Sequence, residues 1–162
     1  KKIQQLTTLG IVQRDDVVIS GDHSIGTPLS IILSRFPNAK VLPLVLKYQQ
    51  NPQNIEKLVR GLQTISTSST LVVASLDFSH YLSSDIAPVK DAQTKQYIVA
   101  RDYKHIEGLS NEYIDSPWTL ITFLKYLEAS GVHEGKQLAH TNTGQIAGQT
   151  IESSTSFFWN AY

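Results

Sequence analysis

Apolar positions along the chain alternate between helical spacing and short uninterrupted runs. Apolar residues three or four positions apart predict helices, because such positions share one face of an α-helix. Short apolar runs rich in β-branched residues predict strands that are covered on both faces. In chain order, the pattern predicts a helix over 1–9, a strand over 17–19, a helix over 25–36, a strand over 40–46, a helix over 54–65, a strand over 70–76, helices over 88–107 and 116–129, and strands over 137–147 and 154–162.

The order of these elements predicts the fold class. Strands and helices alternate up to residue 131, which is typical of an α/β fold with a mainly parallel or mixed sheet flanked by helices. The two late strands are expected to be antiparallel. Pro43 places the strand over 40–46 at a sheet edge or a bulge, since proline cannot donate to a sheet. A chain of 162 residues is long enough for one core and short for two, so a single domain over 1–162 is expected.

Composition and charge exclude several classes of function. Lys and Arg number 14, as do Asp and Glu, and charged residues make up 17% of the chain, below the ~25% typical of soluble domains. The chain therefore lacks the basic excess that nucleic-acid binding requires. With no cysteine, it can form neither a disulfide nor a thiolate metal site. Any metal must be held by histidines and carboxylates.

The apolar runs also bear on location. No run approaches the ~20 residues of a membrane span. The two lysines at the start lead into polar Gln4 and Gln5 instead of a signal-peptide core, so a cytoplasmic protein with no membrane contact is expected. The chain has no methionine, even at position 1, so its first residue is not a translation start, and we expect a fragment of a longer protein.

The strongest candidate for chemistry follows the run over 70–76, where Asp77 and His80 form an Asp-x-x-His pair. In open α/β sheets, loops at the carboxyl ends of strands carry the ligand-binding side chains. A neutral imidazole can bind a metal or move a proton, while a nearby carboxylate fixes its tautomer. The alternative is structural, since an Asp at a strand end often caps a turn and a His beside it can bond locally.

Two further segments have both a functional and a structural interpretation. Asp22 and His23 follow the run over 17–19 and could line a pocket, with Ser24 capping the next helix in the structural alternative. Asp115 precedes a Ser-Pro pair, which in isolation favours a helix cap, although its carboxylate could point into a site. The other histidines, His105, His133 and His140, are weaker candidates. The sequence contains no Gly-x-Ser-x-Gly elbow, phosphate-binding glycine loop or His-Glu-x-x-His helix.

Three segments resemble motifs of a known family. Residues 22–25 (DHSI), 41–46 (VLPLVL) and 74–81 (ASLDFSHY) resemble the Glu/Asp-His-Ser-Ile, Pro-Val-Leu-Val and Ser-Ser-Asp-x-x-His motifs of the Memo family. Bacterial and archaeal members of this family are called AmmeMemoRadiSam system protein B. Order and spacing agree, while the second half of the chain matches more loosely. The family is similar in fold to class III extradiol dioxygenases, so the resemblance implies an α/β domain with one iron or copper ion at an end of the sheet.

The resemblance also implies roles for individual residues. His80 and Asp77 would belong to the active-site pocket as catalytic residues, and His23 would lie beside it. Asp115 falls in the approximate place of a family cysteine, across a gap in the alignment. With His80 it would then be a metal ligand, in a site of the two-His-one-carboxylate type that suits Fe(II).

What the chain lacks shapes the functional hypothesis. The family's Pro-His-Ala-Gly and Gly-Pro-x-His motifs, which supply its principal histidine ligands, are absent. We therefore expect these ligands outside this chain, which would be the C-terminal portion of a Memo-like domain and would bind metal poorly alone. The leading hypothesis is metal-dependent redox chemistry on a small-molecule substrate. The alternatives are a non-enzymatic module that binds a protein or peptide in the same cleft, and metal-assisted hydrolysis.

Overall fold

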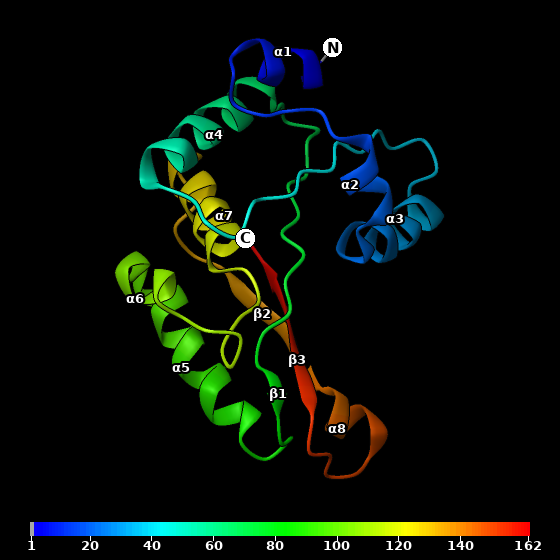
Figure 1. Ribbon diagram of the computed structural model, residues 1–162, viewed down its shortest axis with the longest axis vertical. Helices are drawn as coiled ribbons and strands as arrows, with labels where there is room; N and C mark the ends of the chain where they lie inside the picture. The colour runs from blue at the N-terminus through cyan, green and yellow to red at the C-terminus, as the bar shows by residue number, and fades with distance from the viewer. Residues whose placement is uncertain (1) are drawn as a thin grey trace. The chain divides into compact units, whose positions relative to one another are not determined.

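The chain divides at Ser75 into two units, Lys1–Ser75 and Leu76–Tyr162 (Figure 1). The computed structural model describes residues 2–162, apart from the side chain of residue 159. Each unit is described by itself, and the single domain expected over 1–162 stays a prediction.

The first unit is helical. Its helices are α1 (Lys2–Thr8), α2 (Asp16–Gly21), α3 (His23–Arg35) and α4 (Pro52–Ile65). Helix α4 begins with two sequence signals, since the Asn51 side chain accepts the Asn54 N–H and Pro52 occupies the first turn. Helix α1 lies against α4, where Gly61 faces Leu6. A Cβ at position 61 would come within 2.9 Å of the Leu6 side chain, so glycine permits this close approach. The helices expected at 1–9, 25–36 and 54–65 are confirmed.

Three predicted strands in this part of the chain are wrong. Residues 17–19 lie in helix α2, because Asp15 accepts the Val18 N–H and caps a helix there. Residues 40–46 and 70–76 form neither helix nor strand, and Leu71 is 83% exposed. An apolar run becomes a strand only where a neighbouring strand accepts its backbone hydrogen bonds. Among residues 2–162, no strand pairs with either run.

The second unit combines helices with a small sheet. Its elements are β1 (His80–Leu82), α5 (Ala87–Ala100), α6 (Tyr103–Glu107), α7 (Pro117–Ala129), β2 (Lys136–Asn142), α8 (Thr143–Ala147) and β3 (Ser154–Ala161). In the described chain the sheet has the order β1-β3-β2, and both pairs are antiparallel. This corrects the prediction of a mainly parallel sheet. Helices with a sheet remain consistent with an α/β fold in the broad sense.

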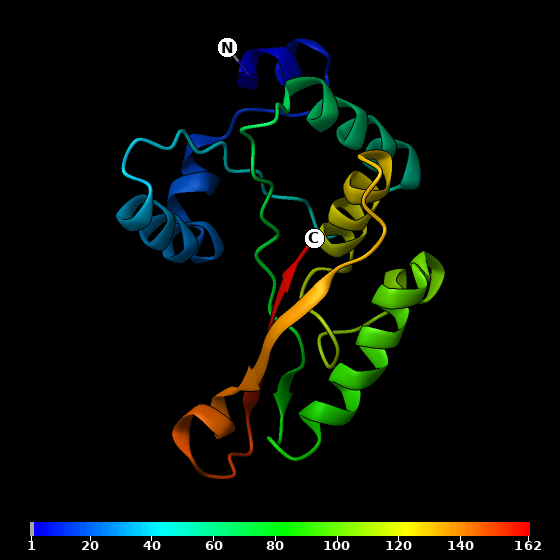
Figure 2. The same cartoon turned by 180° about the vertical axis from the view of Figure 1, so that it is seen from behind.

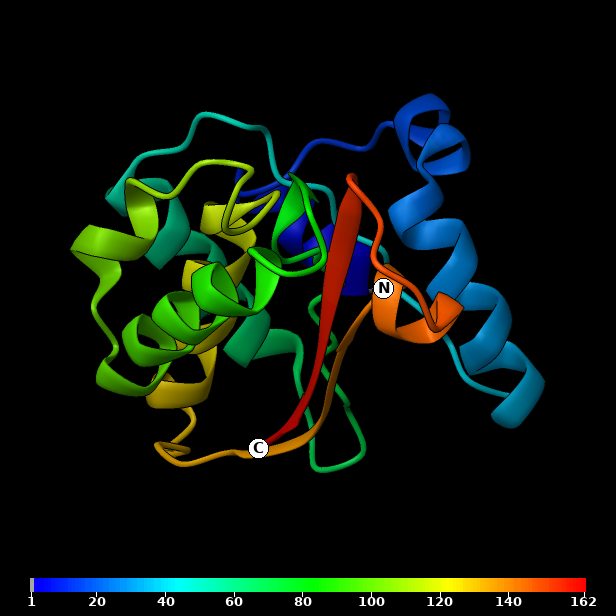
Figure 3. The same ribbon diagram turned by 90° about the horizontal axis from the view of Figure 1, so that it is seen from below.

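The long β2–β3 ribbon is visible from two further sides (Figures 2 and 3). Its pairing runs from Lys136 with Ala161 to Asn142 with Ser156, so the two antiparallel late strands are confirmed. Strand β2 ends earlier than predicted, because Asn142 forms a capping box with Gln145 and starts helix α8.

The helix expected over 88–107 is two helices. Arg101 takes a left-handed conformation with φ of 54° and ends α5, and Asp102 caps α6. Helix α7 matches the prediction for 116–129, with Ser116 as its N-cap and Pro117 in its first turn. The buried apolar residues of this unit are Phe78, Ala87, Ile98, Ile106, Ile114, Leu120, Ile121, Leu124 and Leu127.

Strand β1 is short and irregular. His80 pairs with Thr155 and Leu82 with Ser154, so β1 advances two residues where β3 advances one. The extra residue is Tyr81, whose φ of 56° lies in the left-handed region. This is a β-bulge, a feature that bends a strand and redirects its side chains. No helix of residues 2–162 is long and apolar enough to cross a membrane.

Candidate functional site

The backbone of residues 77–80, which we call the site segment, is held on both sides. On one side it meets β3: Phe78 N–H donates to the Ser156 carbonyl over 3.0 Å, and Ser156 N–H donates to the Ser79 carbonyl over 3.0 Å. On the other side it meets residues 111–115 (Figure 1). There Asp115 N–H donates to the Asp77 carbonyl over 3.0 Å and His80 N–H donates to the Asn111 carbonyl over 3.1 Å. These bonds bring Asp77, His80 and Asp115 together, although Asp115 is far away in sequence.

The imidazole of His80 has one paired and one unpaired nitrogen. Its Nε2 lies 3.5 Å from Oδ2 of Asp77. Its Nδ1 is buried and has no hydrogen-bond partner within the described chain. The His80 side chain is only 11% exposed, whereas that of Asp77 is 44% exposed. A carboxylate beside Nε2 favours a proton there, which leaves the Nδ1 lone pair free to accept a proton or a metal ion.

Asp115 is a buried acid beside this pair. Its Oδ1 is buried and lacks a partner among the described residues. Burial raises the pKa of Asp115 above its ordinary value, the Asp77 charge raises it further, and the Asp77 backbone N–H and His80 oppose the rise. Ser116, not Asp115, is the N-cap residue of α7, and its hydroxyl lies 2.7 Å from that of Thr119. Because Ser116 is the cap residue, the Asp115 carboxylate has no capping role.

The raised pKa of Asp115 predicts a dependence of stability on pH. Since the folded chain holds the proton more tightly, the wild type loses stability as pH rises above the ordinary value of 3.8. Asp115→Asn removes this titration while keeping the shape of the side chain. We expect the variant to gain stability relative to the wild type between pH 4 and pH 7, as measured by urea unfolding at several pH values. Asp85→Asn is the control, because the Asp85 side chain is exposed. A constant difference between Asp115→Asn and wild type would contradict the expectation.

His23 belongs to the first unit, where it is the exposed first residue of α3. The cap of this helix is Asp22, whose carboxylate accepts the Ser24 N–H over 2.9 Å and the Ser24 hydroxyl over 2.6 Å. The hydroxyl bond from Ser24 lowers the pKa of Asp22. Asp22 thus has a structural role, and the helix cap expected at Ser24 lies two residues earlier, at Asp22. That His23 shares a pocket with Asp77 and His80 stays a prediction.

Sequence reasoning missed a second polar cluster in the second unit. Asp91 of α5 is fully buried, with Ser79 and His140 on its two carboxylate oxygens. The buried face of α5 consists of Ala87, Asp91, Thr94 and Ile98. The sequence signal for Asp91 is an acidic residue spaced so that it shares a helix face with apolar residues. His140 appeared only as a weaker candidate.

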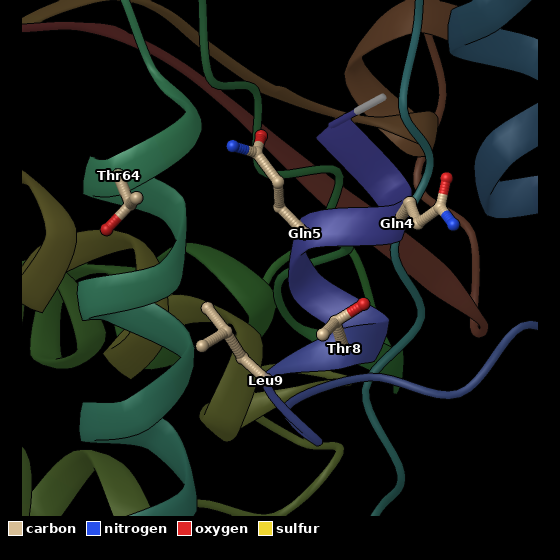
Figure 4. Close-up of a pocket in the computed structure, with 5 residues that line it drawn as sticks. All are labelled: Gln4, Gln5, Thr8, Leu9 and Thr64. Atoms are coloured by element: carbon tan, nitrogen blue, oxygen red, sulfur yellow. The ribbon is translucent and has the colours of Figure 1, made fainter.

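Two cavities of the described chain are not lined by Asp77, His80 or Asp115. One, of about 420 Å³, is lined by Gln4, Gln5, Thr8, Leu9 and Thr64. Figure 4 shows Gln5 of α1 and Leu9, which follows α1, extending toward α4, which carries Thr64. None of these side chains titrates, so the cavity offers no acid–base chemistry. The other, of about 510 Å³, is lined by Ser84, Asp85, Pro88, Gly144, Gln145, Gly148, Gln149 and Thr150. The residues that the structure describes contain no group of three or more His, Cys, Asp or Glu side chains that could hold a metal ion.

The fold and the site define a protein of helices and an antiparallel sheet, with an acid–histidine cluster beside the short strand β1. The family model described as Memo-like protein matches residues 1–157, so the chain belongs to the Memo-like family. The resemblance carried by the three motifs is thereby confirmed. The dioxygenase-like fold stays a prediction, and no solved structure matches the chain significantly.

Curated relatives agree with this membership. A MEMO1 family protein of Caldivirga maquilingensis is 23% identical over 145 residues, which cover 86% of this chain and 51% of that protein. MEMO1 family protein MJ0403 of Methanocaldococcus jannaschii is 26% identical over 147 residues, covering 85% and 51%. A MEMO1 family protein of Metallosphaera sedula is 30% identical over 107 residues, covering 64% and 38%. The chain spans about half the length of the curated relatives it matches.

Proposed function

We propose that this chain supplies part of a metal site that carries out redox chemistry on a small molecule. The observation that supports it most is a pair of buried, unpaired polar atoms, Nδ1 of His80 and Oδ1 of Asp115. Leaving a buried polar atom without a partner costs about 1–3 kcal/mol. Such atoms are expected where another group supplies the missing partner.

The donor types fit the metal that the family resemblance implies. Imidazole nitrogen suits iron and copper, and imidazole with carboxylate is the donor set of non-haem Fe(II) sites. A bound iron or copper ion would supply one-electron redox chemistry. His80 and Asp115 would be ligands from this chain. The remaining ligands, including the principal histidines, would come from outside it.

The other residues of the proposal act on protons and on shape. The Asp77 carboxylate, 3.5 Å from Nε2 of His80, would favour a proton on that nitrogen and so orient the ring with the Nδ1 lone pair free. If His80 is not a ligand, the same geometry makes Nδ1 a general base for a substrate proton. Burial raises the pKa of Asp115 by disfavouring its charged form, and a bound cation would offset that cost by pairing with the carboxylate. In this proposal His23 borders the substrate.

Metal titration of two histidine variants tests this function. In the full-length protein, which supplies the remaining ligands, we expect His80→Ala to weaken Fe(II) binding, measured by anaerobic calorimetry, by at least about tenfold, equivalent to about 1.4 kcal/mol. The matched control is His105→Ala. His105 also follows an Asp at the same spacing, with Nδ1 2.6 Å from Oδ2 of Asp102, but its side chain is 60% exposed. Equal effects of the two variants, or none, would contradict the proposal.

A further inference from the structure

The buried carboxylate of Asp91 joins three elements of the second unit. Its Oδ1 accepts the Ser79 hydroxyl over 2.7 Å and the Ser79 N–H over 3.3 Å. Its Oδ2 lies 2.7 Å from Nε2 of His140 on β2. The Asp91 side chain is 0% exposed and that of His140 is 28% exposed. One acid on α5 thus connects the middle of the site segment to the sheet.

Ser79 is the residue of the site segment that this acid holds. Its neighbours Phe78 and His80 donate their N–H groups to backbone carbonyls of Ser156 and Asn111. The Ser79 N–H instead points to the Asp91 side chain, and the Ser79 hydroxyl does so too at 2.7 Å, with the Ala87 carbonyl as a longer second acceptor at 3.4 Å. Two bonds to one oxygen fix both the backbone and the rotamer of Ser79. Since His80 follows directly, a fixed backbone at Ser79 limits the directions that the His80 ring can take.

The second carboxylate oxygen of Asp91, Oδ2, is bonded by His140. A buried carboxylate is strongly destabilising unless its oxygens are bonded. His140 satisfies Oδ2 from the strand side, and its ring is also held edge-on by Phe158, with centroids 4.4 Å apart. Asp91 is therefore clamped between two partners and cannot turn away from Ser79 without losing the bond to His140.

We propose that Asp91 is a positioning residue for His80, acting through Ser79, with His140 fixing the orientation of the carboxylate. The chemical purpose of this positioning rests on the proposed function. The positioning itself is a property of the chain alone. It predicts that disturbing Asp91 or Ser79 changes the environment of the His80 ring.

Two substitutions and one matched control test the proposal. Ser79→Ala removes the buried hydroxyl that donates to Asp91, and Asp91→Asn replaces the carboxylate that accepts it. The control is Thr94→Val, which also removes a fully buried hydroxyl, one turn further along α5. The Thr94 hydroxyl donates to the Lys90 carbonyl of its own helix over 3.2 Å. Ser79→Ala and Thr94→Val therefore impose similar losses at places that differ in their connection to His80.

The first measurement is the carbon–proton correlation of the His80 ring in histidine-labelled protein, assigned by its absence in His80→Ala. The second is Fe(II) affinity. We expect Ser79→Ala and Asp91→Asn to shift the His80 signal, to alter its cross-peak with the Tyr81 ring, whose centroid lies 5.6 Å away, and to weaken Fe(II) binding about five- to tenfold. Thr94→Val should leave all three unchanged.

Two results would overturn the proposal. One is a His80 signal that is unchanged in both Ser79→Ala and Asp91→Asn; the other is an equal change in Thr94→Val. If Asp91→Asn does not fold, Ser79→Ala decides alone. If the full-length wild type, which includes the remaining ligands, binds no Fe(II), the proposed function fails, while the His80 signal still decides whether Asp91 positions the ring.

Discussion

Replacing Phe78 by alanine is expected to lower the free energy of unfolding of the Leu76–Tyr162 unit by about 3–5 kcal/mol. Phe78 is 4% exposed, and its ring stacks on that of Phe158 with centroids 4.1 Å apart. Alanine would remove this stacking and leave a cavity between the site segment and β3, where tight packing limits relaxation. Since Phe78 lies between Asp77 and Ser79, the site segment should loosen together with the core.

Urea unfolding followed by tryptophan fluorescence measures this loss. Both tryptophans, at positions 118 and 159, belong to the second unit, so the signal reports on that unit. Val89→Ala is the control, because Val89 is 69% exposed and its truncation should cost no more than about 0.5 kcal/mol. A Phe78→Ala loss no larger than that of the control would show that Phe78 does not anchor the site segment.

His140→Ala is expected to have the next largest effect, about 2–3 kcal/mol of lost stability at pH 7. The substitution removes the partner of Oδ2 of Asp91 and leaves a buried carboxylate oxygen unsatisfied. It also removes the edge contact of the imidazole with Phe158. The remaining exposure of the His140 side chain, 28%, lets some water reach the carboxylate and keeps the loss below that of a fully buried pair.

The comparison with His105→Ala separates burial from residue type. His105 also contacts a carboxylate, but at an exposed site, so its removal should cost less than about 1 kcal/mol. Unfolding of the two variants in urea at pH 7 gives the difference directly. Similar small losses would mean that the bond between Asp91 and His140 contributes nothing beyond a surface pair.

Helices of this protein could be predicted because their signals are local. The apolar stripe of α4 and the Ser-Pro start of α7 lie within the helices themselves. Strands could not be predicted equally well, since an apolar run such as 70–76 becomes a strand only when another segment pairs with it. The break between α5 and α6 was missed because Arg101 carries no signal for a left-handed conformation.

The candidate site was predictable in part. Asp77 and His80 are close because they are three residues apart, and the family resemblance implies a place for Asp115 in the same site. The backbone bonds that join Asp115 to Asp77 depend on tertiary structure and leave no mark in the sequence. Asp91 was missed because the apolar side expected for the helix over 88–107 was defined by apolar residues alone, namely Ala92, Tyr97, Ile98 and Ile106. Ile98 and Ile106 are buried, whereas Ala92 is exposed and Asp91 is buried beside Ile98 on the same face.

The bulge at Tyr81 changes which amino acids are favoured at position 81, beside the site, from those typical of a strand to those typical of a turn. A left-handed residue costs about 1–2 kcal/mol with an ordinary side chain and little with glycine. Valine and isoleucine, which are favoured at most strand positions, would be the most destabilising replacements there. Glycine and asparagine would be the least destabilising. Sequence variation at position 81 should therefore follow the rules of a turn, although the residues on either side belong to a strand.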